Sequence, residues 1–328
     1  MSSEQKKMHK TSIGGQALIE GIMMQGPRGA AMSVRLPDKT IETEMLEVKH
    51  VRDKFKPAGF PLIRGIFNFV ESLVFGYKCL TKSAEKSGLD DGETDPEEMS
   101  KLDRWLSDHF GPKMMAVISA ISLVLGLGLS FLLFFYLPSF VVDVFDKYIC
   151  KNALAEIHPL FEGIIRMCIF ILYMVIVSKI PDIRRVFMYH GAEHKSIFCY
   201  EHGLELTVEN VREQKRFHPR CGTSFIFVIL LISILISSVL VVIFPSIDDV
   251  RAVWMVIKLL FLPLTVGIGY EFIRYAGRHE NILVKILSAP GLWMQRITTQ
   301  EPTDDIIEVG IAALKAVITD NPEDDAIE

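Results

Sequence analysis

Residues 114–137 read MMAVISAISLVLGLGLSFLLFFYL, a run of 24 residues without a charged side chain. A second uncharged run, CGTSFIFVILLISILISSVLVVIFPSI, covers the 27 residues 221–247. About 20 apolar residues are enough to cross the hydrocarbon core of a bilayer, so these runs exclude a purely soluble protein. The average composition hides this feature, because 50% hydrophobic and 23% charged residues are ordinary values for a soluble chain.

Two further segments are apolar enough to be membrane helices. Residues 252–270 are interrupted only by Lys258, and residues 160–180 carry Glu162 and Arg166 in their first turns. These two charges would lie at the headgroup interface or face a partner helix. We therefore predict four transmembrane helices, near residues 114–137, 160–180, 222–244 and 252–271.

The distribution of lysine and arginine predicts the orientation of these helices. The loop 138–159 has only Lys147 and Lys151, whereas the segment 179–220 has eight basic residues: Lys179, Arg184, Arg185, Lys195, Arg212, Lys215, Arg216 and Arg220. Cytosolic loops carry the excess of positive charge, which predicts a multi-pass protein of the cell membrane with both termini in the cytosol. The net charge of −5 argues against sequence-specific nucleic-acid binding.

The remaining chain forms soluble regions around the helices. Alternating residues 31–36 and 41–48 flank a turn at 37–40, which indicates a β-hairpin. Residues 60–80 suit an amphipathic helix, either on the membrane surface or in a core. We predict an α+β membrane protein whose regions are 1–82 (glycine-rich β and amphipathic helix), 83–113 (acidic linker), 114–180 (membrane helices), 181–221 (cytosolic His-rich loop), 222–271 (membrane helices) and 272–328 (cytosolic amphipathic region, with a helix capped by Thr303 or Asp304).

The basic cytosolic loop contains the strongest candidate for a metal site, YHGAEHK at residues 189–195. On a helix, His190 and His194 lie four residues apart on one face and can bind one divalent ion. Glu193 stands between them, where a general base is needed, and H-x-x-E-H is the inverted zincin signature. Four of the nine histidines fall within 29 residues, which strengthens the prediction.

A second pair of ligands, His218 and Cys221, precedes the third membrane helix. Pro219 predicts a non-helical knuckle there. Together with His190 and His194, these residues form a tetrahedral set for zinc in a compartment where thiols stay reduced. Solvated histidines that contact lipid phosphate are the alternative. A closed site would be structural and an open one catalytic, and the sequence leaves this choice open because other ligands lie nearby: Glu201, His202, Glu205 and Glu209.

The glycine-rich segment 14–29 is a second candidate, because five glycines in sixteen residues indicate tight turns or close backbone approach. Gln16, Glu20 and Arg28 would line a polar pocket there, or the segment is an irregular β-segment packed under the membrane helices. Glu271, after the fourth membrane helix, is an interfacial anchor or a further carboxylate that faces the metal loop.

Several motifs together resemble the YqhQ-like family of bacterial membrane proteins. They are residues 14–26, PLIRGIFNFVESL at 61–73, YHGAEHKSIFCYE at 189–201, RFHPRCGTSF at 216–225, PGLWMQRITT at 290–299 and QEPTDDIIEV at 300–309. The resemblance covers nearly the whole chain except the acidic linker. It implies a domain of unknown function that is classed as a predicted metal-dependent enzyme, and it points to His190, Glu193, His194, His218 and Cys221.

Two functions from different classes follow. The first is a zinc-dependent hydrolase at the membrane surface, in which His190, His194 and His218 or Cys221 hold the metal and Glu193 is the general base. The second is a non-catalytic factor for membrane-protein assembly or translocation, with a structural metal and a basic surface for a ribosome-associated or other membrane partner. A transporter is less favoured, since Arg166 and Lys258 form no evident relay. Four helices also leave surface for a homo-oligomer.

Overall fold

The computed structural model describes residues 10–48, 50–53, 55–88, 112–151, 157–244, 250–279, 281–319 and 321–326. The chain divides into two compact units. The sheet unit comprises residues 1–90, 174–232 and 263–328, and the helical unit comprises residues 91–173 and 233–262. The protein is mostly helical, with a small antiparallel sheet and four apolar helices, which confirms the predicted combination of elements.

The sheet is a meander in which each strand pairs with the next along the chain. Its strands are β1 (Gly14–Leu18), β2 (Gly21–Gly26), β3 (Gly29–Arg35) and β4 (Ile41–Leu46), in the spatial order β1-β2-β3-β4. The predicted hairpin is confirmed as β3 and β4. The glycine-rich segment, expected as a polar pocket or an irregular β-segment, forms the regular strands β1 and β2 with two-residue turns after each, and its residues 14–17 also line a cavity.

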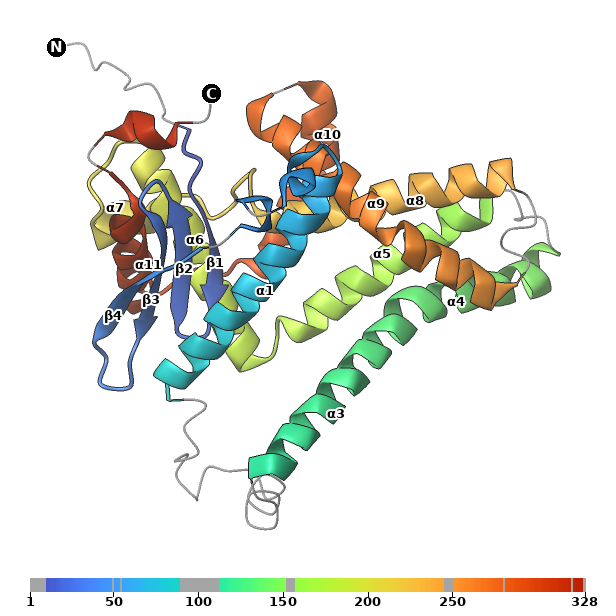
Figure 1. Ribbon diagram of the computed structural model, residues 1–328, viewed down its shortest axis with the longest axis horizontal. Helices are drawn as coiled ribbons and strands as arrows, with labels where there is room; N and C mark the ends of the chain where they lie inside the picture. Colours follow the sequence, from blue (N-terminus) through green and yellow to red (C-terminus); the bar gives the residue numbers. More distant parts are fainter. Residues whose placement is uncertain are drawn as a thin grey trace. The chain divides into compact units, whose positions relative to one another are not determined.

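Helices cover both faces of the sheet (Figure 1). Ile22, Met24 and Ala31 point to the face that packs against α6 (Pro181–Glu201) and α11 (Asp304–Val317). Met23 and Met32, one residue out of phase, point to the opposite face and α1 (Ile63–Lys86). Successive strand residues point to opposite faces, so a sheet buried on both sides needs apolar residues at nearly every central position. The run of buried residues from 21 to 24 fulfils this requirement.

The soluble helices differ in detail from the predicted regions. Helix α1 continues to Lys86, past the expected start of the acidic linker at residue 83, and residues 89–111 of that linker lie outside the described residues. The His-rich segment is not an open loop but the helix α6 followed by the short α7 (Val208–Arg212). Helix α10 spans Ile282–Thr298, and Thr303 is the N-cap of α11, as expected.

Four apolar helical segments are long enough to span a membrane. The first is longer than predicted, because α3 (Pro112–Phe131) and α4 (Leu137–Phe145) join through π-helical turns into one helix that ends at Cys150. Residues 138–150, expected in a loop, are therefore helical. The other three are α5 (His158–Val177), α8 (Gly222–Ile243) and α9 (Arg251–Arg278).

The charges in the second and fourth apolar helices face one another inside the helical unit. Glu162 on α5 accepts a hydrogen bond of 2.5 Å from Arg166 one turn later, and it also accepts one from Lys258 on α9. Arg166 further donates to the carbonyl of Phe134 at 2.8 Å. Of the two sequence alternatives, contact with a partner helix is therefore the one observed. A charge in this apolar setting is tolerated because it is paired and hydrogen-bonded.

The first testable prediction concerns Gly191, where α6 approaches the chain before α11. A Cβ atom on Gly191 would lie 2.1 Å from the backbone oxygen of Gln300, which cannot rotate away. We expect Gly191→Ala to lower the free energy of unfolding by about 1–3 kcal/mol, although alanine favours a helix. The control is Gly277→Ala in α9, whose Cβ would meet no atom within 4 Å. Thermal denaturation in detergent should separate them, and equal melting temperatures would refute the prediction.

Candidate metal centre

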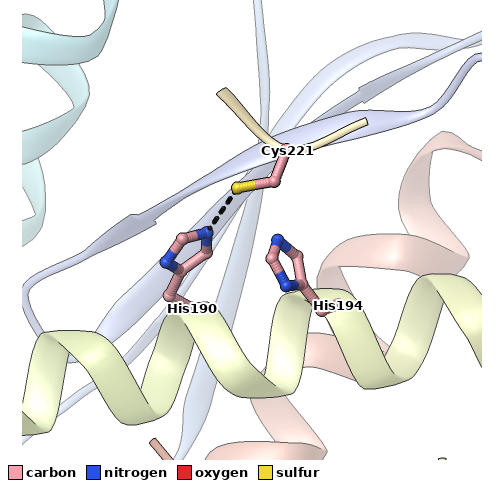
Figure 2. A group of neighbouring side chains, drawn as sticks. All are labelled: His190, His194 and Cys221. Carbon is pink, nitrogen blue, oxygen red and sulfur yellow. Dashed lines mark hydrogen bonds between the residues drawn. The ribbon is translucent and has the colours of Figure 1, made fainter. Parts of the chain in front are cut away.

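Two histidines of α6 and one cysteine before α8 form a compact cluster. One ligand atom from each of His190, His194 and Cys221 lies within 4.8 Å of the other two. The two imidazoles project from the same side of α6, one turn apart, and the Cys221 thiol lies above them (Figure 2). Nitrogen and thiolate donors in this number suit zinc, which binds His and Cys in tetrahedral sites with three or four protein ligands. The donor set therefore fits a zinc ion.

Hydrogen bonds to backbone carbonyls fix both imidazole rings. Nδ1 of His190 donates to the oxygen of Thr298 at 2.9 Å, and Nδ1 of His194 donates to the oxygen of Arg216 at 2.6 Å. A carbonyl can only accept, so each Nδ1 carries the proton and each Nε2 keeps its lone pair. Nε2 of His190 lies 3.1 Å from Sγ of Cys221. Metal-binding histidines are usually oriented in this way by a partner on the other ring nitrogen.

The electrostatics of the cluster favour the protonation states that a metal requires. Burial lowers the pKa of His194, and the neighbouring His190 lowers it further, which favours the neutral ring. Burial alone would raise the pKa of the Cys221 thiol, but the neighbouring His194 and the hydroxyl of Thr223, 3.3 Å from Sγ, bring it below its usual value. Ligands must be a neutral imidazole and a thiolate, so the site is prepared for a cation.

Glu193 lies beside this cluster and is only 5% exposed. Its carboxyl packs against Gly15 of β1, where a Cβ atom would come within 3.0 Å of it, and it accepts a hydrogen bond from the Gly15 amide. Burial raises the pKa of the Glu193 carboxyl to about 7, against the opposing effect of His190. Within the described residues, Oε2 of Glu193 is buried without a hydrogen-bond partner. A buried carboxyl group with a raised pKa next to candidate metal ligands marks a candidate functional site.

His218 lies next to the cluster and makes a different contact. Its ring centroid is 5.5 Å from that of His194, while its Nε2 is 3.7 Å from a carboxylate oxygen of Glu201 and 3.4 Å from Nη2 of Arg220. Arg220 itself forms an ion pair with Glu201. The predicted knuckle is present, because residues 213–221 are non-helical and α8 begins at Gly222. The three-residue cluster therefore contains Cys221 but not His218.

Of the predicted pocket residues, Gln16 belongs to the strand that lines the cavity beside the cluster, whereas Glu20, Arg28 and Glu271 lie elsewhere in the sheet unit. Gln16 faces α1, where its amide lies against Gly76. Glu20 is in the β1–β2 turn and pairs with Arg185 of α6, whereas Arg28 is exposed in the β2–β3 turn at the opposite end of β2. Glu271 pairs with Arg64 of α1 rather than with the metal cluster.

A cavity of about 340 Å³ opens onto the cluster. Its walls come from three stretches of chain: the start of the sheet (Ile13 to Ala17), one side of α6 (Val186, Phe187, His190, Glu193, His194 and Ile197) and the knuckle (His218 and Arg220 to Thr223). This volume is at the lower end of the range for small-ligand sites, roughly 300–1,000 Å³. A ligand in the cavity would touch the cluster and Glu193 together.

Sequence reasoning missed the residue that holds the knuckle in place. Gln295 of α10 is fully buried, and its side-chain amide forms two hydrogen bonds with the backbone of His218, accepting from the nitrogen at 2.7 Å and donating to the oxygen at 2.8 Å. A lone glutamine in a helix gives no signal of this role in one sequence. A fully buried amide with both ends satisfied fixes the backbone that leads to Cys221.

The fold and the site define the class of protein. It is mostly helical, with four helices that could cross a membrane, and its sheet unit contains a His-His-Cys cluster. Residues 60–320 match the family described as "Protein of unknown function (DUF1385)". The chain is 33% identical over 309 residues to the "Uncharacterized protein YqhQ" of Bacillus subtilis (strain 168), covering 94% of this chain and 92% of that protein. The chain belongs to this family, as its motifs predicted. No solved structure matches it.

The second testable prediction follows from the clamp on the knuckle. Gln295→Leu keeps the side-chain volume but leaves the buried nitrogen of His218 unpaired and removes one of the two hydrogen bonds to its oxygen, so we expect a loss of about 1–3 kcal/mol in stability. Because Cys221 would lose its fixed position, zinc affinity should also fall by about 10–100-fold, as for other outer-shell changes. Thermal denaturation and zinc titration measure the two effects. Gln25→Leu, at an exposed strand position, is the control, and an unchanged affinity in Gln295→Leu would contradict the clamp.

Proposed function

We propose that this protein is a membrane-embedded hydrolase that depends on a divalent metal, zinc by its donor set. The observation that carries the proposal is the orphaned Oε2 of the buried Glu193 beside two oriented imidazoles and the Cys221 thiol in the lining of one cavity. A purely structural zinc site has four protein ligands, whereas a catalytic site keeps an open position and a nearby base. Three clustered ligands and an unpartnered carboxylate favour the catalytic kind.

In this proposal each residue has a separate role. His190, His194 and Cys221 hold the cation, and the carbonyls of Thr298 and Arg216 keep the two rings aimed at it. A bound divalent cation acts as a Lewis acid that polarises a carbonyl and acidifies water. Glu193 takes the proton from the attacking water and passes it to the leaving group. The buried surroundings of Glu193 keep its carboxylate basic enough for this transfer.

We further propose that the sheet unit lies on the cytosolic side of the cell membrane, with both termini in the cytosol. The excess of lysine and arginine in residues 179–220 supports this orientation. Cys221 directly precedes α8, so the cluster would lie close to the membrane surface. A substrate that reaches the membrane surface from the cytosol fits this location.

The alternative is an assembly or translocation factor with a structural metal and a basic docking surface. Two contacts disfavour it, because two basic groups of the expected surface are paired within the chain. Arg212 pairs with Asp304 at 2.6 Å, and Arg216 pairs with Glu301 at 3.3 Å. These ion pairs reduce the positive charge that an anionic partner would meet.

The third testable prediction separates the two functions. Purified protein should contain about one zinc per chain, and His190→Ala, His194→Ala or Cys221→Ala should remove it. Glu193→Gln should keep the zinc and lower hydrolysis of a mixed panel of peptides and esters about 10²–10⁴-fold, because it removes the base. Metal analysis and product analysis by mass spectrometry are the measurements.

The matched control is Glu209→Gln, an exposed carboxylate of α7, which should behave as wild type. Zinc that is present and required for stability, combined with wild-type behaviour of Glu193→Gln in every assay, would overturn the catalytic proposal and favour the structural one. Absence of zinc from the wild-type protein would overturn both.

A further inference from the structure

Strand β1 is an edge strand of the sheet, and its free edge lies at the candidate metal centre. The strand order β1-β2-β3-β4 leaves one side of β1 unpaired within the described sheet. The same strand forms a wall of the cavity that contains His190, Glu193 and His194. An unpaired strand edge is a row of backbone donors and acceptors that can bind another extended chain.

The register shows which groups of β1 face outward. Leu18 pairs with Gly21 across a two-residue turn, which makes this pair hydrogen-bonded. Hydrogen-bonded pairs alternate along an antiparallel ladder, so Gln16 also bonds to β2 while Gly15 and Ala17 point their N–H and C=O groups away from it. The hydrogen bond from the Gly15 amide to Glu193 agrees with this assignment, because it places Glu193 on the outer side of β1.

We propose that the substrate is a polypeptide segment that binds in extended form as an added strand on β1, with its scissile amide beside Glu193. This inference rests on the proposed hydrolase function and specifies its substrate class. The N–H and C=O of Ala17 and the C=O of Gly15 would pair with the backbone of the segment. Recognition of this kind gives affinity through main-chain hydrogen bonds and is independent of most side chains.

The cavity favours a peptide over a phospholipid headgroup. Arg220 is the only lysine or arginine among the described lining residues, and it is ion-paired with Glu201. An anionic headgroup would therefore find no free cation of the described chain there. The outward groups of Gly15 and Ala17 suit the repeat of a β-strand, which a lipid ester lacks.

The reaction is the hydrolysis of an amide and consumes one water. The water oxygen forms a bond to the amide carbon, and the C–N bond breaks. Glu193 accepts a proton from the water and returns it to the departing nitrogen, so the carboxylate is regenerated. The products are a carboxylic acid and an amine, which at neutral pH become a carboxylate and an ammonium group by transfer of the remaining proton, and no oxidant, reductant or further co-reactant is needed.

The fourth testable prediction concerns a variant that closes the free edge without touching the metal ligands. Ala17→Pro removes an outward N–H and covers the edge with a ring, a change that an edge strand tolerates. The matched control is Met45→Pro on β4, the opposite edge. The β3–β4 register points the Met45 amide away from its partner strand in the same way, and Met45 is 51% exposed. The full-length protein in detergent is incubated with a library of tryptic peptides, and cleavage is followed by mass spectrometry.

We expect wild type and Met45→Pro to cleave the same peptides, and Ala17→Pro to retain zinc but lose at least tenfold in kcat/KM. Zinc-loaded wild-type protein that cleaves esters but no peptides would overturn the substrate inference and leave the hydrolase proposal intact. Equal peptide cleavage by Ala17→Pro would also overturn it. If wild-type protein contains no zinc, or hydrolyses neither esters nor peptides, the hydrolase proposal itself would be refuted.

A second measurement does not depend on how well Ala17→Pro folds. One cleaved peptide is synthesised with a single N-methyl group moved along its backbone, and each version is tested with wild-type protein. If the peptide binds as a strand, an N-methyl group should slow cleavage only at every second amide near the scissile bond, because only alternate amides of a strand donate hydrogen bonds to β1. If N-methylation lowered cleavage equally at every position, or at none, this binding mode would be overturned.

Discussion

The arrangement of the sheet unit depends on the burial of a polar helix. Glu193, His194, Lys195, Ser196 and Glu201 of α6 are all buried between the sheet and the rest of the unit. Each buried polar group costs free energy unless another group pairs with it, so the surroundings of α6 must supply partners. The carbonyl of Arg216 accepts a hydrogen bond from His194, and the carbonyl of Arg212 accepts one from Lys195 at 2.7 Å. The Thr11 amide donates a hydrogen bond of 2.9 Å to Glu201. These partners come from distant parts of the chain, which is why the knuckle, the N-terminal segment and α6 must meet.

Several buried polar atoms of the described residues lack a partner, among them Ser196 Oγ and Glu193 Oε2 of α6, and the second of these lies at the candidate centre. Among the described residues, Oε2 of Glu193 has no partner although it lies beside a cysteine and two oriented imidazoles. A buried group is left unpaired at a free-energy cost, and such exceptions are typical of functional sites. The helical unit offers a contrast, because Glu162 there is paired with both Arg166 and Lys258 and its charges hold α5 and α9 together. The two buried carboxyl groups thus differ: Glu162 has two charged partners, whereas Oε2 of Glu193 has none among the described residues.

Glycine at two positions lets the backbone come close enough for this arrangement. Gly15 allows β1 to approach the Glu193 carboxyl, and Gly191 allows α6 to meet the carbonyl of Gln300. A side chain at either position would separate the elements that form the cavity. The sequence marks both residues as glycine but gives no reason, because the close approach involves segments more than 100 residues apart. Both positions fall within the motifs by which the chain resembles its family, at residues 14–26 and 189–201.

The sequence by itself determined the apolar helices, the β3–β4 hairpin and the one-turn spacing of His190 and His194, because hydrophobic runs, alternation and helical periodicity are local properties. It also brought Cys221 into the candidate set by its chemistry. Only the tertiary structure decided that Cys221 joins the two histidines while His218 turns to Glu201, and that Glu20, Arg28 and Glu271 lie apart. It also decided that β1 offers a free edge to the cavity. These outcomes depend on contacts between distant segments, and the free energy of such contacts is fixed by which groups the folded chain buries together rather than by the spacing of residues along it.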